Sequence, residues 1–357
     1  MNQPKFKILS IDGGGIRGII PCQILSDLEN DLIKVNGPET RLCDYFDLIA
    51  GTSTGGIIAI GIALGVKAQT MLELYINHGS EIFPPKNQTK KSKFIKILQD
   101  RPFYSRARLR ELLIDAYETN TGIRDVRLGN AKSRLIIPTY SLENREINVL
   151  KTAHSEFLER DYQIPAVDAA LSTAAAPAYF TPYDFEYKHK GKDGDSRFLK
   201  MVDGGIVANN PAFMALLEAT NCLNIPLDEI GLLSLGTGIS KKKCPKSSVK
   251  ATPLFWVNPI KGPMLYEIMA EAQSILVDNL INLYKNGVGG ANMDKFKYCR
   301  LQHQFSESES IDLDSTSAIN IEIMRQIAQN IYRKECSKIK MIFTTKTKPD
   351  FTPIHQL

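Results

Sequence analysis

The sequence predicts an α/β protein in which a central, mostly parallel sheet is flanked by helices. The 357 residues begin with a β-rich run at 6–11, a helix-like stretch at 21–35 and a compact apolar run at 45–50. Strand, helix and strand in this order are typical of a parallel βαβ unit. Hydrophobic residues make up 43% of the chain, which is ample for a buried core and excludes a disordered or collagen-like protein.

The rest of the chain continues this alternation. We expect helices at residues 55–65, 166–175 and 211–220, and strands at 134–140, 147–150, 199–202 and 230–235. After a Lys/Pro-rich segment we expect a helix at 263–284, a strand at 297–301 and a helix at 315–334. We therefore predict an α/β core at residues 1–240. Residues 241–357 then supply a basic connecting segment and C-terminal helices that pack on this core.

The sequence carries no signature of a membrane span, a leader or a metal centre. Its longest apolar run, residues 55–65, is far shorter than the roughly 20 residues that cross a bilayer. The N-terminus lacks the apolar core and cleavage pattern of a signal peptide. Six cysteines at irregular spacings, without CxxC or partnered histidines, disfavour zinc or iron–sulfur binding. We expect a cytoplasmic protein, peripheral at membranes, with no metal and no cofactor.

Basic side chains gather in one segment, which begins at Lys86 and ends at Arg110 and also contains aromatic residues. A solvated helix and loop is the simplest interpretation. The functional interpretation is an interfacial patch, because cations attract anionic head groups while aromatic rings enter the lipid boundary. The net charge of +5 is too small to predict nucleic-acid binding, and no nucleic-acid motif accompanies the segment.

Three glycine-bearing motifs each follow a predicted strand. The first is DGGGIRG at residues 12–18, whose glycines formally satisfy the GxGxxG pattern of anion-binding loops. The second strand does not close on the acidic residue that a dinucleotide fold requires, and no GK[ST] follows the glycines. A dinucleotide site and a P-loop are therefore rejected. The remaining anion for such a loop is a developing oxyanion.

The second motif is GTSTGG at residues 51–56, a GxSxG sequence between a strand and an apolar helix. A sharp strand-to-helix turn of this kind exposes the serine on a strained backbone, and small flanking residues avoid a clash. The context predicts that Ser53 is a nucleophile. A plain turn that caps the following helix is the alternative interpretation.

A nucleophilic serine needs a base, which can be a histidine, a lysine or a carboxylate. His303 could complete a Ser, Asp, His order, but it lies between two glutamines in an ordinary strand-like segment. The third motif, MVDGGI at residues 201–206, favours Asp203, because this carboxylate follows a short apolar strand and precedes two glycines. Capping of the helix that begins near Pro211 is the alternative role for Asp203.

Together these segments resemble the patatin-like phospholipases. The resemblance is carried by DGGGIRGIIP at 12–21, DYFDLIAGTSTGG at 44–56, STAAAPAYF at 172–180, VDGG at 202–205 and LLSLGTG at 232–238. It covers nearly the whole chain, most securely residues 5–238. The family implies a three-layer fold and a lipid acyl hydrolase of phospholipase A or lysophospholipase type, which uses a Ser/Asp dyad without a catalytic histidine.

Carried onto this chain, the resemblance makes Ser53 the nucleophile and Asp203 the base, with the backbone amides of Gly13, Gly14 and Gly15 as the oxyanion hole. The supporting motif residues are Asp12, Arg17, Gly18, Gly51, Gly55, Gly204 and Gly205. The implied enzyme cleaves fatty-acyl esters of membrane or micellar lipid through an acyl-enzyme. Two alternatives are a regulated bacterial effector, host-directed or switched by a cyclic-nucleotide or protein activator, and a largely non-catalytic lipid-binding or storage protein.

Overall fold

A computed structural model describes residues 3–84, 104–189, 195–240, 264–286, 296–306, 309 and 311–357. Most of the basic segment that begins at Lys86 therefore lies outside the described residues, which resume at Tyr104. Within the described end of that segment, Arg108 pairs with Glu81 and Arg110 with Asp168, so part of its charge is compensated inside the chain.

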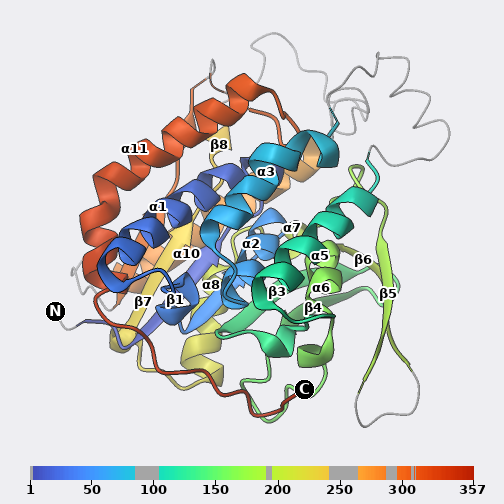
Figure 1. Cartoon of the computed structure of the whole chain (residues 1–357), viewed down its shortest axis with the longest axis horizontal. Coiled ribbons are helices and arrows are strands. Elements are labelled where there is room, and N and C mark those ends of the chain that lie inside the picture. Colours follow the sequence, from blue (N-terminus) through green and yellow to red (C-terminus); the bar gives the residue numbers. More distant parts are fainter. Residues whose placement is uncertain are drawn as a thin grey trace.

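The centre of the fold is an eight-stranded sheet with the order β5-β6-β3-β2-β1-β7-β9, and β4 pairs with β3 beside this path (Figure 1). Strands β3, β2, β1, β7 and β9 run parallel, whereas β4, β5 and β6 add antiparallel pairs. The strands are β1 (Phe6–Ile11), β2 (Leu48–Gly51), β3 (Arg134–Ser141), β4 (Glu146–Lys151), β5 (Tyr183–Lys188), β6 (Asp195–Asp203), β7 (Ile230–Leu235) and β9 (Lys297–Leu301). A separate pair consists of β8 (Ile239–Ser240) and β10 (Gln304–Phe305).

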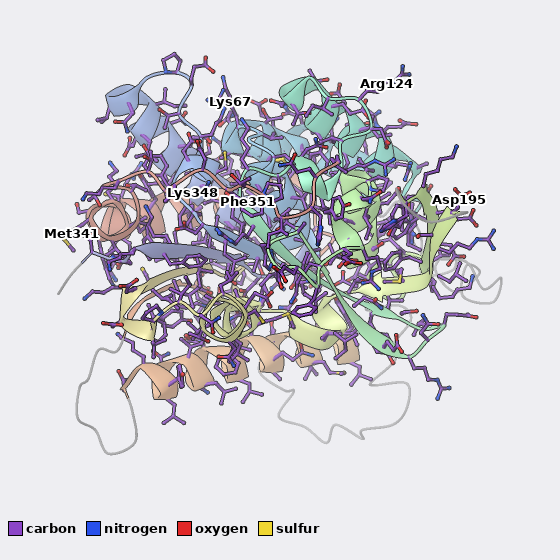
Figure 2. The ribbon with its side chains drawn as sticks, turned by 90° about the horizontal axis from the view of Figure 1, so that it is seen from below. Lys67, Arg124, Asp195, Met341, Lys348 and Phe351 are labelled. Atoms are coloured by element: carbon purple, nitrogen blue, oxygen red, sulfur yellow. The ribbon has the colours of Figure 1, made fainter. Side chains whose placement is uncertain are left out.

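Helices cover both faces of the sheet, which gives three layers (Figure 2). The helices are α1 (Ile19–Asn36), α2 (Thr54–Ala63), α3 (Ala68–Ile82), α5 (Ala107–Thr121), α6 (Ala166–Thr173), α7 (Gly205–Ala208), α8 (Ala212–Leu217), α10 (Met264–Asn286) and α11 (Ala318–Phe343). The period of two along a strand divides the core between these layers. In β1, Leu9 and Ile11 join the cluster under α1, α2, α3 and α11, whereas Phe6 and Ile8 join the cluster under α8 and α10. The predicted fold class is thus confirmed.

The predicted elements of the N-terminal half agree well with the structure, but two helices were missed. α3 and α5 carry buried apolar positions at helical spacing, including Met71, Leu72, Tyr75, Leu109 and Leu113. α11 also continues nine residues beyond the predicted end at 334, because Ile339 and Phe343 extend its buried stripe. None of the helices in the described ranges combines the length and apolarity needed to cross a bilayer.

The division of the chain at residue 240 remains a proposal. The later region contributes β9 directly to the main sheet, where it pairs with β7 from Gly231 to Leu235. α11 packs along α1, at the opposite end of the sequence (Figure 1).

Candidate active site

Ser53 lies in the turn between β2 and α2, where the backbone is strained. Its φ of 55° and ψ of −125° are unusual for a residue with a side chain. The turn is tight, because a side chain at Gly55 would overlap the carbonyl oxygens of Ile11 and Asp12. Thr173 accepts a hydrogen bond from the Ser53 amide at 3.1 Å and so fixes the turn. The observed strand, turn and helix match the context predicted for this motif.

The strand order brings Asp203 close to Ser53, because β2 and β6 both pair with β3. β2 pairs with β3 as far as Ala50 and Ile136, and Ser53 lies in the turn just beyond this end of β2. Farther along β3, Thr139 is the antiparallel partner of Asp203 in β6. The hydroxyl of Ser53 donates to the Oδ2 atom of Asp203 at 2.6 Å, across 150 residues of sequence. Both residues are buried, so water does not compete for this hydrogen bond.

Asp203 is a carboxylate in an apolar setting with three hydrogen-bond donors. Ser53 donates to one oxygen, the Gly205 amide donates to the other at 2.7 Å, and the Tyr266 hydroxyl is the third donor. Burial raises the pKa of Asp203 to about 6, while these hydrogen bonds act in the opposite direction. The group is therefore ionised at neutral pH and has a pKa close to it, as a general base requires.

The glycine loop after β1 lies beside Ser53, and its three amides differ in their hydrogen bonds. The Gly13 amide donates to the Asn209 carbonyl at 3.0 Å and is thus already engaged. The amides of Gly14 and Gly15 make no hydrogen bond to any other described residue. Gly15 has a φ of +56° and packs against the Leu313 carbonyl, so only glycine suits this position. The oxyanion-hole role of Gly13, Gly14 and Gly15 stays a prediction, and Gly14 and Gly15 are the two whose amides are not already engaged within the described residues.

A buried ion pair between Asp12 and Arg300 anchors the glycine loop to the sheet. Sequence reasoning nominated Asp12 but did not nominate Arg300. Arg300 of β9 forms a bidentate pair with Asp12, at 2.8 and 2.6 Å. Ser274 of α10 donates to the same carboxylate at 2.7 Å. Bidentate geometry fixes orientation as well as charge, so Asp12 anchors the loop to β9 and α10. No sequence signal connected Arg300 with Asp12, since 288 residues separate them.

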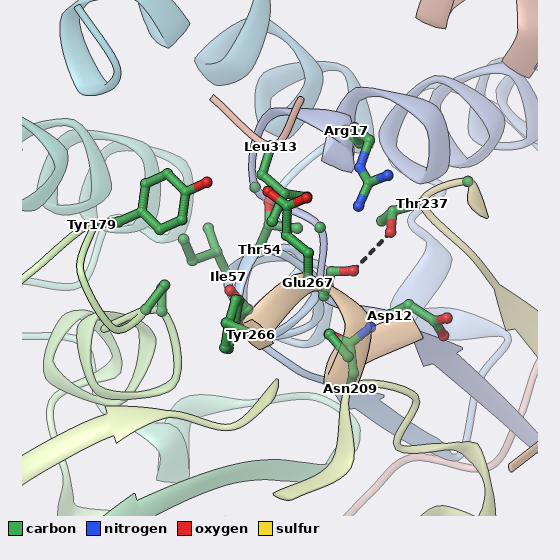
Figure 3. A pocket seen from close by; sticks show the side chains of 18 of the residues that line it. Asp12, Arg17, Thr54, Ile57, Tyr179, Asn209, Thr237, Tyr266, Glu267 and Leu313 are labelled. Carbon is green, nitrogen blue, oxygen red and sulfur yellow. Dashed lines mark hydrogen bonds between the residues drawn. The ribbon is translucent and has the colours of Figure 1, made fainter. Parts of the chain in front are cut away.

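Arg17 lies buried at the wall of the cavity that contains Ser53. Burial lowers the pKa of its guanidinium, and the nearby carboxylates of Glu271 and Glu267 act in the opposite direction. The place of Arg17 among the supporting motif residues stays a prediction. Figure 3 shows Arg17, Glu267 and Tyr266 around the same cavity.

The cavity opens directly above Ser53 and the glycine loop. Residues of the glycine loop, the Ser53 turn and α10 line it together. One side is apolar and is lined by Ile57, Ile82, Phe83, Leu109, Tyr179 and Phe180. The other side carries the polar groups of the loop and of α10.

His303 does not take part in this arrangement. Its ring packs edge-on against Phe305, with the centroids 5.1 Å apart, and its Nε2 atom lies 3.8 Å from Glu309. The carboxylate of Asp203, and not this imidazole, contacts the Ser53 hydroxyl.

The fold and the site define an α/β protein whose ligand cavity lies at the carboxyl ends of parallel strands. The sequence matches the profile of the family described as Patatin-like phospholipase over residues 9–216. The chain therefore belongs to the patatin-like phospholipase family, whose members act broadly as lipid hydrolases.

Relatives occur in plants and bacteria. Patatin-like protein 2 of Arabidopsis thaliana is 29% identical over 94% of this chain and 84% of its own length. A cGAMP-activated phospholipase of Vibrio cholerae is 34% identical over 65% of this chain and 64% of its own length. The probable inactive patatin-3-Kuras 1 of Solanum tuberosum is 28% identical over 93% of this chain and 87% of its own length. Among solved structures, VipD from Legionella pneumophila is 12% identical, with a TM-score of 0.45 over 96% of this chain and 67% of that chain.

Proposed function

We propose that this protein is a serine-dependent lipid acyl hydrolase of phospholipase A or lysophospholipase type. Ser53 is the nucleophile and Asp203 the general base. The observation that carries the proposal is the 2.6 Å hydrogen bond between these residues at the floor of an apolar cavity. A strained serine with a buried base is the arrangement that activates a hydroxyl for acyl transfer.

In the first half of the reaction, Ser53 Oγ attacks the ester carbonyl carbon and its proton moves to Asp203. The carbonyl oxygen becomes an oxyanion, which the Gly14 and Gly15 amides stabilise by hydrogen bonds. When the intermediate collapses, the bond to the alcohol oxygen breaks. The alcohol leaves with the proton from Asp203, and the acyl group remains on Ser53 as an ester.

In the second half, water attacks the acyl-enzyme. Asp203 accepts a proton from this water, the oxyanion forms again at the glycine loop, and collapse expels Ser53 Oγ. The Ser53 oxygen recovers its proton from Asp203, and the fatty acid departs. One carboxylate thus serves both halves, first as base and then as acid.

The test is fatty-acid release from phosphatidylcholine vesicles, analysed by mass spectrometry, together with labelling by a fluorophosphonate probe. Ser53→Ala and Asp203→Asn should each lower the rate by at least about 10³-fold, and Ser53→Ala should also abolish labelling. His303→Ala is the control and should retain activity. Full activity of Asp203→Asn would exclude the dyad.

A largely non-catalytic lipid-binding or storage protein is the competing function, and the Solanum tuberosum relative is named as probably inactive. The Ser53–Asp203 hydrogen bond argues against it, because a binding protein needs no activated hydroxyl. Lack of fluorophosphonate labelling on Ser53 in the folded protein would favour it.

Regulation by a small molecule is a second proposal, suggested by the relative named as a cGAMP-activated phospholipase. We expect turnover to rise when cyclic GMP–AMP is added if this chain shares that control. Equal rates with and without the nucleotide would indicate that the enzyme is constitutive, or that a protein activator such as a host factor is required. Peripheral membrane contact through the segment from Lys86 to Arg110 also remains a proposal.

A further inference from the structure

The helix α10 contacts the protein through polar side chains and the buried Ile281, and it exposes many large apolar side chains on its outer side. Of the twenty exposed large apolar side chains among the described residues, eight belong to this helix of 23 residues. They are Leu265, Ile268, Met269, Ile275, Leu276, Leu280, Leu283 and Tyr284, and their exposed fractions range from 39% to 59%. Scattered apolar residues need no explanation, but a concentration of this kind marks an interaction surface.

These side chains form one stripe. Together with the exposed Ala272, they recur mostly at spacings of three and four residues, so they share one face of the helix. From Leu265 to Asn286, every exposed residue is uncharged. Figure 2 shows α10 along one edge of the molecule, with side chains pointing away from the sheet. We call this stripe the outer face of α10.

The opposite side of α10 makes polar contacts that explain why the helix does not turn its apolar side inward. Gln273 accepts from the Asn209 amide and donates to the Ile206 carbonyl, both at 3.0 Å. Asp278 accepts from the Tyr298 hydroxyl at 2.7 Å. Together with the Ser274 and Tyr266 contacts at the site, these hydrogen bonds fix the rotation of the helix about its axis. Because these hydrogen bonds hold the inner side of α10 against the protein, the outer face remains exposed to solvent.

The same helix also forms part of the active-site cavity. Tyr266, Glu267, Ala270, Glu271 and Ser274 line it, and the first four lie within one helical turn of Leu265, Ile268 or Met269 on the outer face. A bilayer or a protein partner that binds to the outer face of α10 would therefore lie next to the cavity above Ser53. Lipid substrate that leaves a bilayer at this point would travel only a short distance to the cavity.

We propose that the outer face of α10 is the surface by which this enzyme docks on a lipid bilayer, an inference that rests on the proposed lipid substrate. An uncharged apolar stripe on a single helix matches a helix that lies in the membrane interface. Charge favours a bilayer over a second copy of this chain. In the sequence, residues 241–263, which directly precede α10, contain six lysines and no acidic residue. These lysines would repel one another if two copies met at this face, whereas anionic lipid head groups would attract them.

The test is binding to extruded vesicles, measured by co-sedimentation with the full chain. All proteins carry Ser53→Ala, so that binding is read without hydrolysis and independently of the proposed chemistry. The vesicles consist of phosphatidylcholine alone, or of phosphatidylcholine with phosphatidylglycerol at a ratio of about 3:1, which separates apolar from electrostatic binding. Hydrolysis of a soluble ester by the unsubstituted protein, which retains Ser53, tests the proposed function separately.

The variant is the pair Leu276→Glu and Leu283→Glu, whose side chains are 56% and 59% exposed and lie outside the cavity lining. We expect it to bind both vesicle types at least about tenfold more weakly. The control is Met341→Glu in α11, which is 57% exposed and is expected to bind within about twofold of the parent. The pair Leu276→Gln and Leu283→Gln repeats the test without added charge, and thermal unfolding verifies the fold of each protein.

Unchanged vesicle binding by both Leu276/Leu283 pairs would overturn the proposal. If, in addition, sedimentation velocity showed a dimer of the parent that these pairs dissociate, the outer face would cover a second copy instead. An equal loss of binding in the Met341 control would also overturn it, because the effect would then not be specific to α10.

Discussion

The hydrogen bond from Tyr266 to Asp203 allows a quantitative prediction about the pH dependence of catalysis. Tyr266→Phe removes one of the three donors that stabilise the charged form of this buried carboxylate. Hydrogen bonds to charged groups are worth about 1.5–3 kcal/mol, and 1.36 kcal/mol corresponds to one pH unit. Because Ser53 and Gly205 remain as donors, we take the lower limit and expect the acid limb to move up by about one pH unit.

The effect on rate follows from the fraction of ionised base. With the pKa of Asp203 at about 6, half of the enzyme has its base ionised at pH 6. A rise of about one unit leaves roughly a tenth ionised at that pH, so kcat/KM should fall about fivefold at pH 6 and change little above pH 8.5. The assay is the pH profile of kcat/KM with a soluble p-nitrophenyl ester between pH 5 and 9.

The control for this prediction is Tyr332→Phe. Tyr332 donates to Asp31 at 2.8 Å, so the substitution removes the same type of hydrogen bond, but neither residue lines the cavity. Its profile should coincide with that of the parent. An unchanged acid limb in Tyr266→Phe, or an equal shift in Tyr332→Phe, would refute the assignment of Asp203 as the titrating base.

Three further predictions concern stability and the geometry of the site. Asp203→Asn should unfold at higher urea concentration at pH 7.5 but not at pH 4, because the raised pKa means that ionisation of Asp203 costs on the order of 3 kcal/mol as pH rises through about 6. Arg300→Met should lower the free energy of unfolding by about 3–5 kcal/mol, since it leaves Asp12 charged and buried. If the double variant Arg300→Met and Asp12→Asn were destabilised equally, an ion-pair effect would be contradicted. Gly55→Ala should abolish ester hydrolysis, because its methyl group would meet the Ile11 carbonyl, and activity near that of the parent would show that the turn is not constrained.

Local patterns in the sequence were sufficient to predict much of the fold. β1, α1 and β2 follow from an alternating run, a helical run and a short apolar run, and each occurs within a few residues of the predicted place. The strained turn at Ser53 was also predictable, because GxSxG between a strand and a helix constrains the backbone locally. α3 and α5 were missed although their apolar spacing was present, because no motif drew attention to them.

Contacts between distant segments account for the rest. Sequence could nominate Ser53 and Asp203, but only the β2–β3–β6 strand order brings them to 2.6 Å. The engagement of the Gly13 amide by Asn209 likewise depends on how two loops pack, which periodicity does not encode.

The sequence by itself therefore determined the fold class and the family, and it nominated the residues that we propose carry the chemistry, because short motifs impose backbone geometry within a few residues. The tertiary structure alone decided which groups meet. It joined Arg300 to Asp12, and it set the rotation of α10, whose apolar stripe resembles that of a core helix in sequence but faces solvent in the fold. Rotation about a helix axis depends on the polar partners that the rest of the chain supplies, and for α10 those partners lie on the inner side.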